Sequence, residues 1–512
     1  MREIVLVLDF GSQYSQLIAR RIRELGVYAE IVRHDITAQE VAKLSPKALV
    51  LSGGPASVCE EGSPLMDPAL LKGGAPALGI CYGMQLMADI LGGKVQRQIS
   101  REYGPATLQV DVSDGLLGGL ERNLDVWMSH GDYVAQLPPN FRVLAHTGDC
   151  AVAAMGDQAG RLFGVQFHPE VVHTPYGKEM LSNFLFKTAG CSGGWTMANF
   201  IEEQTAKIRA TVGDDQVICA LSGGVDSSVV AALLARAIGP RMHAIFVDNG
   251  LLRQGEAQQV RETFTKDYPL NLTVADARAE FISALSGVQE PERKRKIIGK
   301  TFIDVFQRHA REIPGAKFLA QGTLYPDVIE SVSAKGGPSA TIKTHHNVGG
   351  LPAKLGFKLI EPLRELFKDE VRRLGAELHL PRPMLARQPF PGPGLAVRIL
   401  GEVTEPDLET LRQADWIVQQ EIHAWEGHHQ LWQWFAVLLP VKSVGVMGDQ
   451  RTYANVVAVR AVTSLDAMTA DWARIPPEVL ARISSRIINE VRGVNRVVYD
   501  ISSKPPSTIE WE

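Results

Sequence analysis

The sequence predicts an α/β protein: two doubly wound, mostly parallel α/β domains followed by a small α+β domain. Short β-branched runs alternate with helical segments from Ile4 to about residue 320, which is typical of parallel sheets covered by helices. Beyond a Pro-Gly cluster at 389–394 the pattern changes to two helices and three strand runs. The 512 residues suit about three domains. We place them at 1–188, 189–387 and 388–512.

The first domain alternates strands with helices from its beginning. Its predicted strands are short apolar runs: Ile4–Phe10, Ala48–Leu51, Ala77–Ile80 and Phe163–Phe167. Ile18, Ile22 and Leu25 recur at helical spacing after the first strand, and a helix over 84–91 follows the third. The turn-rich segment 191–194 then predicts a domain boundary.

The second and third domains differ in the order of their elements. The second repeats the alternation, with predicted strands at Gln216–Leu221, His243–Val247, Leu272–Ala275 and Phe318–Ala320. The third has helices over Pro406–Trp425 and Pro477–Val491, and strands at Phe435–Val441, Val456–Val462 and Arg496–Ile501. Strands no longer alternate one for one with helices, so we expect a small α+β domain there.

Composition narrows the class of protein. The net charge is −4, from 53 Lys and Arg against 57 Asp and Glu, whereas a dedicated nucleic-acid binder usually carries a basic excess. Five cysteines without a C-x-x-C pair fit a reducing cytosol better than a disulfide framework. We find neither a signal peptide nor an apolar run near the roughly 20 residues that span a bilayer. We expect a cytoplasmic protein whose partners are small molecules or protein, with no nucleic acid and no membrane.

A candidate nucleophile lies between a strand and a helix of the first domain. Gly79-Ile-Cys-Tyr-Gly83 matches the G-x-nucleophile-x-G elbow, which exposes a nucleophile above a sheet. The N-terminus of the following helix lowers the pKa of a cysteine thiol, which suits Cys81 for acyl transfer. The alternative is a buried cysteine at a tight turn.

Two further strand ends supply the other parts of an acyl-transfer site. His168 and Glu170 point the same way if the strand continues through them, so Glu170 can orient the imidazole that takes the thiol proton. Gly53 and Gly54, after another strand, offer backbone N–H groups for an oxyanion hole. We interpret His130 as structural, although it could line the pocket.

These residues resemble the class I glutamine amidotransferases over residues 1 to about 188. The resemblance implies that Cys81 attacks the glutamine carboxamide, ammonia leaves, and water hydrolyses the thioester. By the same resemblance, Gln85 and the loop at 100–104 would help to hold glutamine.

The second domain carries a candidate phosphate site. Ser222-Gly-Gly-Val-Asp-Ser-Ser228 lies between a strand and an apolar helix, where backbone N–H groups and the helix dipole attract anions. It is not a Walker A loop, because the G-K-[ST] lysine is absent. The string resembles the PP-loop of N-type ATP pyrophosphatases, which cleave ATP between its α and β phosphates.

That resemblance implies an ATP site that includes residues from several strand ends. The expected ATP contacts are Ser222, Gly223, Gly224, Val225, Asp226, Ser227, Ser228, Val247, Gly322 and the lid residue Lys343. Asp226 would lie near a Mg²⁺ ion. Asp327 and Glu330 lie three apart and could share that ion, or simply form a solvated helix turn.

C-terminal strings extend the resemblance to the whole chain. Segments 390–395, 448–453 and 504–512 are similar to those of the glutamine-hydrolysing GMP synthetases. That family adenylates XMP with ATP, replaces AMP by ammonia to give GMP, and forms a homodimer through its third domain. The XMP contacts implied by the resemblance are Arg295, Pro391, Gly392, Pro393, Gly394, Gln450, Lys504, Thr508, Ile509 and Glu510.

Three alternatives remain open at this point. Another PP-loop amidotransferase, such as glutamine-dependent NAD synthetase, would need a different type of glutaminase. A PP-loop tRNA-modifying enzyme would call for a nucleic-acid-binding domain or reactive cysteines near the second site. A nucleotide sensor without catalysis would not need the set of Cys81, His168 and Glu170.

Overall fold

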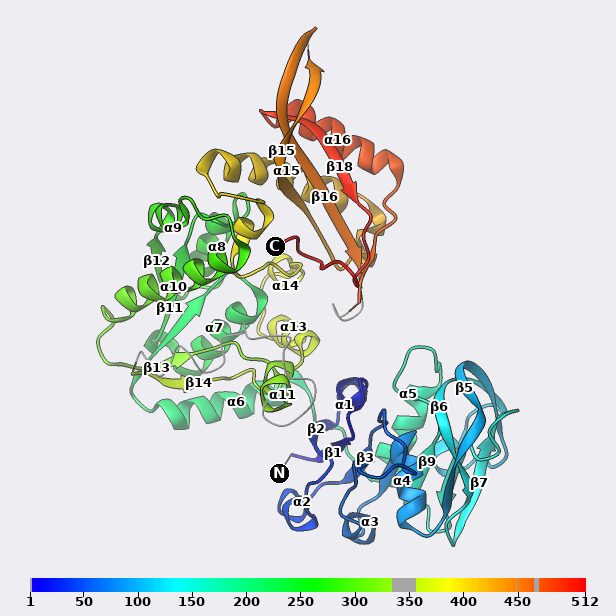
Figure 1. The fold of residues 1–512 in the computed structure, drawn as a ribbon. Coiled ribbons are helices and arrows are strands. Elements are labelled where there is room, and N and C mark those ends of the chain that lie inside the picture. Colours follow the sequence, from blue (N-terminus) through cyan, green and yellow to red (C-terminus); the bar gives the residue numbers. More distant parts are fainter. Residues whose placement is uncertain (1, 334–355, 448, 465–468) are drawn as a thin grey trace. The chain divides into compact units, whose positions relative to one another are not determined.

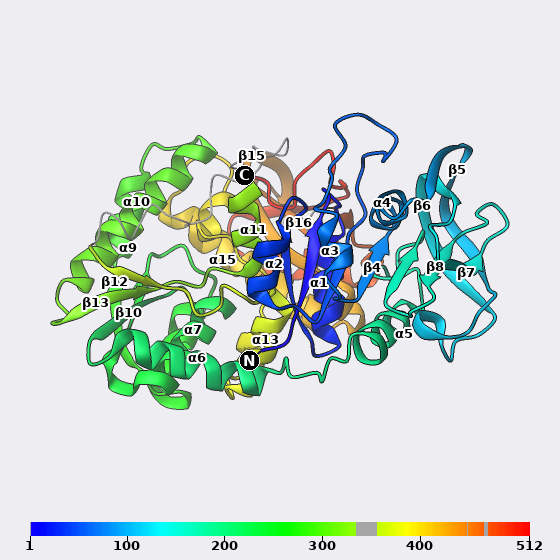
Figure 2. The same cartoon turned by 90° about the horizontal axis from the view of Figure 1, so that it is seen from below.

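The computed structural model describes residues 2–333, 356–447, 449–464 and 469–512. Contacts divide the chain into two compact units, Met1–Phe200 and Ile201–Glu512. Figure 1 shows the order of the elements within each unit, and Figure 2 shows them from below. The predicted α/β fold class is confirmed in both units.

The first unit contains one nine-stranded sheet in the order β2-β1-β3-β4-β9-β8-β7-β5-β6. Its first five strands in that order are parallel: β2 (Tyr28–Arg33), β1 (Ile4–Asp9), β3 (Ala48–Leu51), β4 (Ala77–Ile80) and β9 (Leu162–Val165). The helices are α1 (Ser15–Glu24), α2 (Ala38–Leu44), α3 (Ala69–Lys72), α4 (Tyr82–Ile90) and α5 (Gly177–Ser182), which continues through a π-helical turn at Asn183–Thr188. Four of these five strands match predicted strands.

The remainder of that sheet is antiparallel and was not predicted. It comprises β8 (Ala154–Asp157), β7 (Phe141–His146), β5 (Lys94–Val110) and β6 (Asn123–Gln136). The segment 100–104, expected to be a loop, lies within β5, so that expectation is wrong. Its pairing with β6 shifts register between Arg97 and Glu102, so one strand carries extra residues there.

The second unit begins with a fully parallel sheet in the order β12-β11-β10-β13-β14. Its strands are β10 (Gln216–Leu221), β11 (Met242–Asp248), β12 (Asn271–Asp276), β13 (Ala316–Ala320) and β14 (Lys358–Ile360). The helices are α6 (Met197–Val212), α7 (Val225–Ile238), α8 (Glu256–Glu262), α9 (Arg278–Leu285), α10 (Pro291–Ala310), α11 (Tyr325–Ser333), α13 (Lys368–Glu377) and α14 (Arg382–Leu385). Helices α9 and α10 cover one face and α6 and α7 the other (Figure 2).

A four-stranded sheet completes the second unit. It contains β15 (Gln433–Met447), β16 (Gln450–Thr463), β17 (Asp471–Trp472) and β18 (Val494–Asp500), with helices α15 (Glu405–His423) and α16 (Pro477–Glu490). One hydrophobic core joins the two sheets of this unit, from Ile218 on β10 to Val457 on β16. Strands β15 and β16 extend beyond the sheet as a long hairpin (Figure 1).

None of the described helices combines the length and the apolar composition that a membrane-crossing helix requires.

Candidate active sites

Cys81 lies in a strained turn between β4 and α4. Its φ angle is +48°, in the region that residues with a side chain rarely adopt. A Cβ on Gly79 would lie 2.6 Å from the nitrogen of Met84, and one on Gly83 would collide with the carbonyl of Leu51. Both glycines are therefore needed for the turn to pack closely on its neighbours. This is the geometry of a nucleophile elbow.

The three predicted acyl-transfer residues meet in one buried cluster. The Cys81 Sγ lies 3.4 Å from His168 Nε2, and His168 Nδ1 lies 2.7 Å from Glu170 Oε1. All three are at most 5% exposed. The Tyr14 ring stands edge-on to the imidazole, with centroids 5.0 Å apart. Since the carboxylate accepts from Nδ1–H, the nitrogen that faces the sulfur is the one free to exchange a proton.

The surroundings of His168 favour the protonated imidazole. Burial by itself lowers the pKa of His168, but the Cys81 charge and hydrogen bonds to Cys81 and Glu170 raise it to about 11. A protonated imidazole beside the sulfur stabilises the thiolate and holds the proton that a leaving amine needs.

Gly53 and Gly54, the two residues predicted to form an oxyanion hole, follow β3 in a closely packed turn. A Cβ added to Gly53 would lie 3.6 Å from the His168 Cε1 and 3.7 Å from the Cys81 Cβ, so Gly53 faces both residues with little space between them. Gly54 is equally constrained, because a Cβ there would lie 2.8 Å from the Phe10 carbonyl. Within the described ranges, neither backbone N–H is paired with another backbone group.

Gln85 forms part of the wall beside the nucleophile. Its side chain is buried, and its Nε2 donates to the Asp132 carbonyl at 2.9 Å and to Gln166 Oε1 at 3.1 Å. The Cys81 Sγ lies 3.0 Å from the Gln166 carbonyl oxygen. Gln85 and Cys81 are thus both in contact with Gln166, a residue that belongs to none of the sequence motifs.

The predicted phosphate loop joins β10 to α7. Gly223 has a φ of +77°, and Gly224 is the N-cap of α7. The Ser222 and Ser227 hydroxyls are 3.0 Å apart, and Ser228 donates to the Gly224 carbonyl at 2.7 Å. The loop therefore leads directly into the N-terminus of a long helix, which is an anion-binding arrangement.

Neighbouring strand ends bring other predicted ATP residues to this loop. A Cβ on Gly322, after β13, would lie 3.3 Å from the Asp226 Cβ. Val247 is buried near the end of β11, the strand paired in parallel with β10. Lys368, on α13, binds both carboxylate oxygens of Asp226 at 2.6 Å. These groups meet at the carboxyl edge of a parallel sheet, where such folds place ligands.

The predicted metal residues are only partly described. The Asp327 carboxylate accepts the Leu324 N–H at 2.9 Å, so it serves at least as a cap for α11. The backbone of Glu330 is helical, but its side chain lies outside the described part of the chain, and so does all of Lys343.

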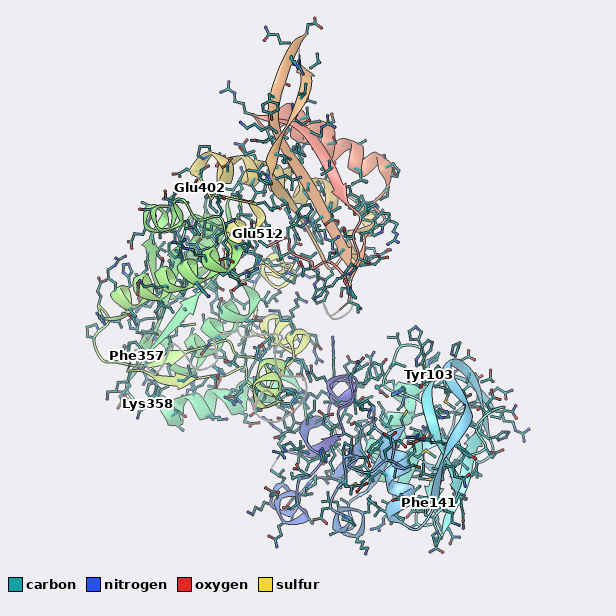
Figure 3. The ribbon with its side chains drawn as sticks, viewed as in Figure 1. Tyr103, Phe141, Phe357, Lys358, Glu402 and Glu512 are labelled. Carbon is teal, nitrogen blue, oxygen red and sulfur yellow. The ribbon has the colours of Figure 1, made fainter. Side chains whose placement is uncertain are left out.

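Most of the predicted XMP residues lie around the C-terminal tail. The tail is packed against the unit: Glu510 binds Arg398 at 2.8 Å, and Glu512, which is labelled in Figure 3, binds the fully buried Lys294 at 2.6 Å. Arg295 bonds the Glu512 carbonyl, and Thr508 presents its carbonyl to Arg460. Ile509 is buried, and Lys504 pairs with Ala470 through backbone hydrogen bonds.

Segment 391–394 lies near the tail, but Gln450 does not. Gly394 has a φ of +65° and packs against the Leu251 carbonyl, while the Gln433 amide links the Pro389 carbonyl to Glu510. Gln450 lies at the opposite end of the hairpin, paired with Met447. Gln450 is twelve residue steps along β16 from Val462, which lies near the tail, and this is a span of roughly 40 Å.

Comparison with known proteins decides the family. The chain is 60% identical over 511 residues to the GMP synthase (glutamine-hydrolyzing) of Oleidesulfovibrio alaskensis, covering 99% of both chains. It is 57% identical over 511 residues to that of Aquifex aeolicus, covering 100% of both. A solved glutamine amidotransferase structure from Thermotoga maritima is 19% identical, with a TM-score of 0.31, over 37% of this chain and 100% of that one.

The chain belongs to the glutamine-hydrolyzing GMP synthase family. Three family models match successive parts of this family member. They are glutamine amidotransferase class-I over residues 6–188, asparagine synthase over 203–279 and GMP synthase C terminal domain over 420–511. The first covers the elbow and both triad partners, and the second covers the phosphate loop.

Two groups in this GMP synthase family member were missed from the sequence. Lys368 pairs with Asp226 although 142 residues separate them, and Arg387 donates to the Gly223 carbonyl at 2.6 Å. Neither lies in a motif, so no local signal could have found them. The N–H of Tyr82 was also overlooked, although an elbow motif implies that the residue after the nucleophile helps to form the oxyanion hole.

Proposed function

We propose that this protein is a ligase that makes GMP from XMP, with glutamine as the nitrogen donor and ATP as the activating substrate. The observation that carries the proposal is the presence of a Cys-His-Glu triad and a PP-loop on one chain whose full-length relatives are named GMP synthase. The two sites divide the reaction into release of ammonia and activation of its acceptor.

Ammonia would be released at Cys81. The sulfur would attack the glutamine carboxamide carbon, and the N–H groups of Gly53, Gly54 and Tyr82 would stabilise the oxyanion. Protonated His168 gives its proton to the departing nitrogen, which leaves as ammonia. Water then attacks the thioester while His168 takes a proton from it, and glutamate leaves. Glu170 keeps the imidazole oriented in both steps.

XMP would be activated at the phosphate loop. The C2 oxygen of XMP attacks the α phosphorus of ATP, and pyrophosphate leaves against the loop serines and the start of α7. Ammonia then attacks C2, and AMP leaves with the original oxygen. Lys368 and the predicted lid residue Lys343 would balance the charge of the departing pyrophosphate.

We further propose Mg²⁺ as the cation for this site. Asp226 offers a carboxylate at the N-terminus of α7, where it is already paired with the cation of Lys368. Carboxylate and phosphate oxygens are the ligands that Mg²⁺ prefers. Asp226 would hold the ion, with Asp327 and Glu330 as further candidates, and the ion would neutralise phosphate charge.

A homodimer would account for the remote position of Gln450. The outer part of the β15–β16 hairpin, residues 441–453, exposes Val444, Val446 and Tyr453, the last two by 75% and 70%. Val444 and Tyr453 are directly opposite each other, and Val446 is two residues along, so the three share one face. We propose that this apolar face packs on a second copy and brings Gln450 to its partner's XMP site.

We also propose that the chain has three domains, at 1–188, 189–387 and 388–512. A cytoplasmic location is supported by the five cysteines, all of which are free.

Product analysis tests the proposed reaction. The full chain is incubated with XMP, ATP, Mg²⁺ and glutamine, and the nucleotides and phosphates are quantified. We expect GMP, AMP and pyrophosphate in equal amounts. Release of ADP and orthophosphate in step with GMP would contradict the adenylate mechanism.

A further inference from the structure

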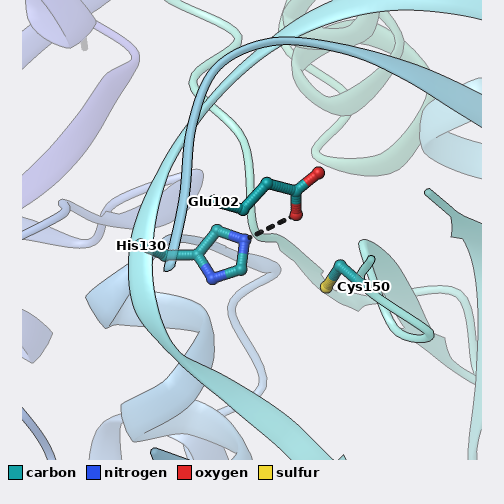
Figure 4. Close-up of side chains that lie close together, drawn as sticks. All are labelled: Glu102, His130 and Cys150. Carbon is teal, nitrogen blue, oxygen red and sulfur yellow. Dashed lines mark hydrogen bonds and ion pairs between the residues drawn. The ribbon is translucent and has the colours of Figure 1, made fainter. Parts of the chain in front are cut away.

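A cluster of three metal-ligating side chains lies in the antiparallel half of the first sheet. Glu102 is on β5, His130 is on β6, and Cys150 follows β7 (Figure 4). One ligand atom from each lies within 4.8 Å of the other two. In residues 2–333 and the other described ranges, this is the one group of three or more such side chains that meets this distance.

The hydrogen bonds of His130 place its Nε2 lone pair against a Glu102 carboxylate oxygen, so that two acceptors face each other. The Nδ1 lies 3.0 Å from the Asp132 carbonyl, which can only accept, so Nδ1 carries a proton. In the neutral ring Nε2 then has a lone pair, yet it lies 3.1 Å from Glu102 Oε2. Two acceptors at this distance require a proton or a cation between them. The His130 side chain is 2% exposed and that of Glu102 12%, so water screens the contact poorly.

A second layer of hydrogen bonds holds the other two side chains. The Thr147 hydroxyl donates to Glu102 Oε1 at 3.1 Å and accepts the Cys150 N–H at 3.0 Å. Because the Thr147 hydroxyl binds Oε1 of Glu102, the other oxygen, Oε2, is the one that faces His130. Metal-binding histidines usually donate their second ring N–H to a carbonyl or carboxylate, as His130 does to Asp132. The cluster thus has both the ligands and the supports of a metal site.

The ligand types indicate which cation would fit. Thiolate, imidazole and carboxylate together suit zinc, whereas magnesium and calcium prefer oxygen ligands. Burial raises the pKa of the Cys150 thiol to about 12, so the thiol keeps its proton unless a cation replaces it.

We propose that Glu102, His130 and Cys150 form a zinc-binding site separate from the Cys81 centre, with a fourth position open to water. Zn²⁺ binding forms a bond to each ligand atom and releases the thiol proton to solvent. The site borders the glutaminase centre, because the Asp132 carbonyl accepts from both His130 Nδ1 and Gln85 Nε2.

A cobalt titration tests this site without using activity as the readout. The full chain carries Cys59→Ser and Cys81→Ser, which remove the exposed thiol and the nucleophile and leave three buried thiols. Co²⁺ bound to a thiolate gives a charge-transfer band in the near ultraviolet. We expect this band to saturate at one equivalent of Co²⁺ and to disappear when Zn²⁺ is added.

Matched variants decide whether the band comes from this cluster. Adding Cys150→Ser should abolish it, whereas Cys191→Ser, which alters another buried thiol of the same unit, should leave it unchanged. Thr147→Val should weaken Co²⁺ binding about 10- to 100-fold, as loss of a supporting hydrogen bond usually does. The circular dichroism spectrum and the melting temperature of each variant serve as the folding check. The absence of a band in the Cys59→Ser, Cys81→Ser protein, or a band that survives Cys150→Ser, would overturn the proposal.

Discussion

The proposed nucleophile, Cys81, has a small set of close neighbours, and all of them belong to the first unit. Its turn requires two glycines, its sulfur meets His168, and the N-terminus of α4 follows it directly. The phosphate loop belongs to the second unit and has its own cation, Lys368. Loss of the nucleophile should therefore leave the chemistry of the second unit intact.

Cys81→Ala should separate the two chemistries. We expect glutamine-dependent GMP synthesis to fall at least about 1,000-fold, because the nucleophile is gone. Synthesis from ammonium salts should stay within about twofold of wild type. Cys191→Ala is the matched control and should retain both activities. If Cys81→Ala lost both activities equally, the proposed division of labour would be wrong.

At the scale of single residues, the sequence predicted those site residues that lie together in a short motif. Gly79, Cys81 and Gly83 lie in one string, and His168 and Glu170 in another, so their cluster could be predicted from the sequence alone. Lys368 and Gln166 reach the sites only through tertiary packing. Their positions depend on how the strands and helices pack in space, and this packing cannot be predicted from one amino-acid sequence.

The C-terminal tail, residues 504–512, is held against the second unit by ion pairs. Without the family resemblance, segment 504–512 would be interpreted as a frayed end. Instead, Glu510 and Glu512 neutralise Arg398 and Lys294, both of which are fully buried. An unpaired buried cation is strongly destabilising. The tail therefore belongs to the packed structure, and the Glu510 side chain is engaged by Arg398 and Gln433.

Helices α15 and α16 are joined by a charge network that should depend on pH. Glu421 binds Arg482 at 2.9 Å and Arg486 at 3.0 Å. Burial raises the pKa of Glu421, but the two arginines outweigh it and lower the pKa below the usual 4.5. A lowered carboxyl pKa contributes stability above the unfolded value, and this is lost as pH falls through the folded value.

Glu421→Gln should therefore destabilise the protein at pH values above the unfolded-state pKa of Glu421, neutral pH included. We expect a loss of about 1 kcal/mol at pH 7, as for a partly exposed network, which shrinks as pH falls below 4.5. Thermal melting at several pH values measures it. Glu409→Gln, on the same helix and 57% exposed, is the control and should change melting little. An equal loss at pH 7 and pH 4 would show that charge is not the cause.

Parallel strands were predicted more readily than antiparallel ones. Strands such as β3 and β4 are buried on both faces and form continuous apolar runs. Strand β6 instead alternates buried residues with intermediate or exposed ones from Asn123 to Ala135, as a strand with one wet face does. Because half of its residues are polar, β6 does not form a continuous apolar run and was not predicted as a strand. The alternation with a period of two was nevertheless present in the sequence.

The whole molecule is expected to act as a pair. The hairpin at 441–453 extends an apolar face beyond its own sheet, and Gln450 lies far from the other predicted XMP residues of its own chain. Exposed apolar groups of this kind mark contact surfaces. A second copy would cover the face and complete the substrate site.

Val446→Asp with Tyr453→Asp should yield monomers. Two charges on the apolar face would have to be buried without partners, which is costly. Light scattering coupled to size-exclusion chromatography measures the mass. Leu65→Asp, at a 59% exposed leucine of the first unit, should leave the dimer intact. A dimer that survived both hairpin substitutions would place the interface elsewhere.

The central claim is that the phosphate loop adenylates an oxygen of XMP and that ammonia then displaces AMP. It is tested most directly with XMP carrying heavy oxygen at C2, converted by the full chain with ATP, Mg²⁺ and glutamine. Mass spectrometry of the products follows the label. The account predicts that the heavy oxygen appears in the phosphate of AMP. Unlabelled AMP, or label in orthophosphate released alongside ADP, would contradict it.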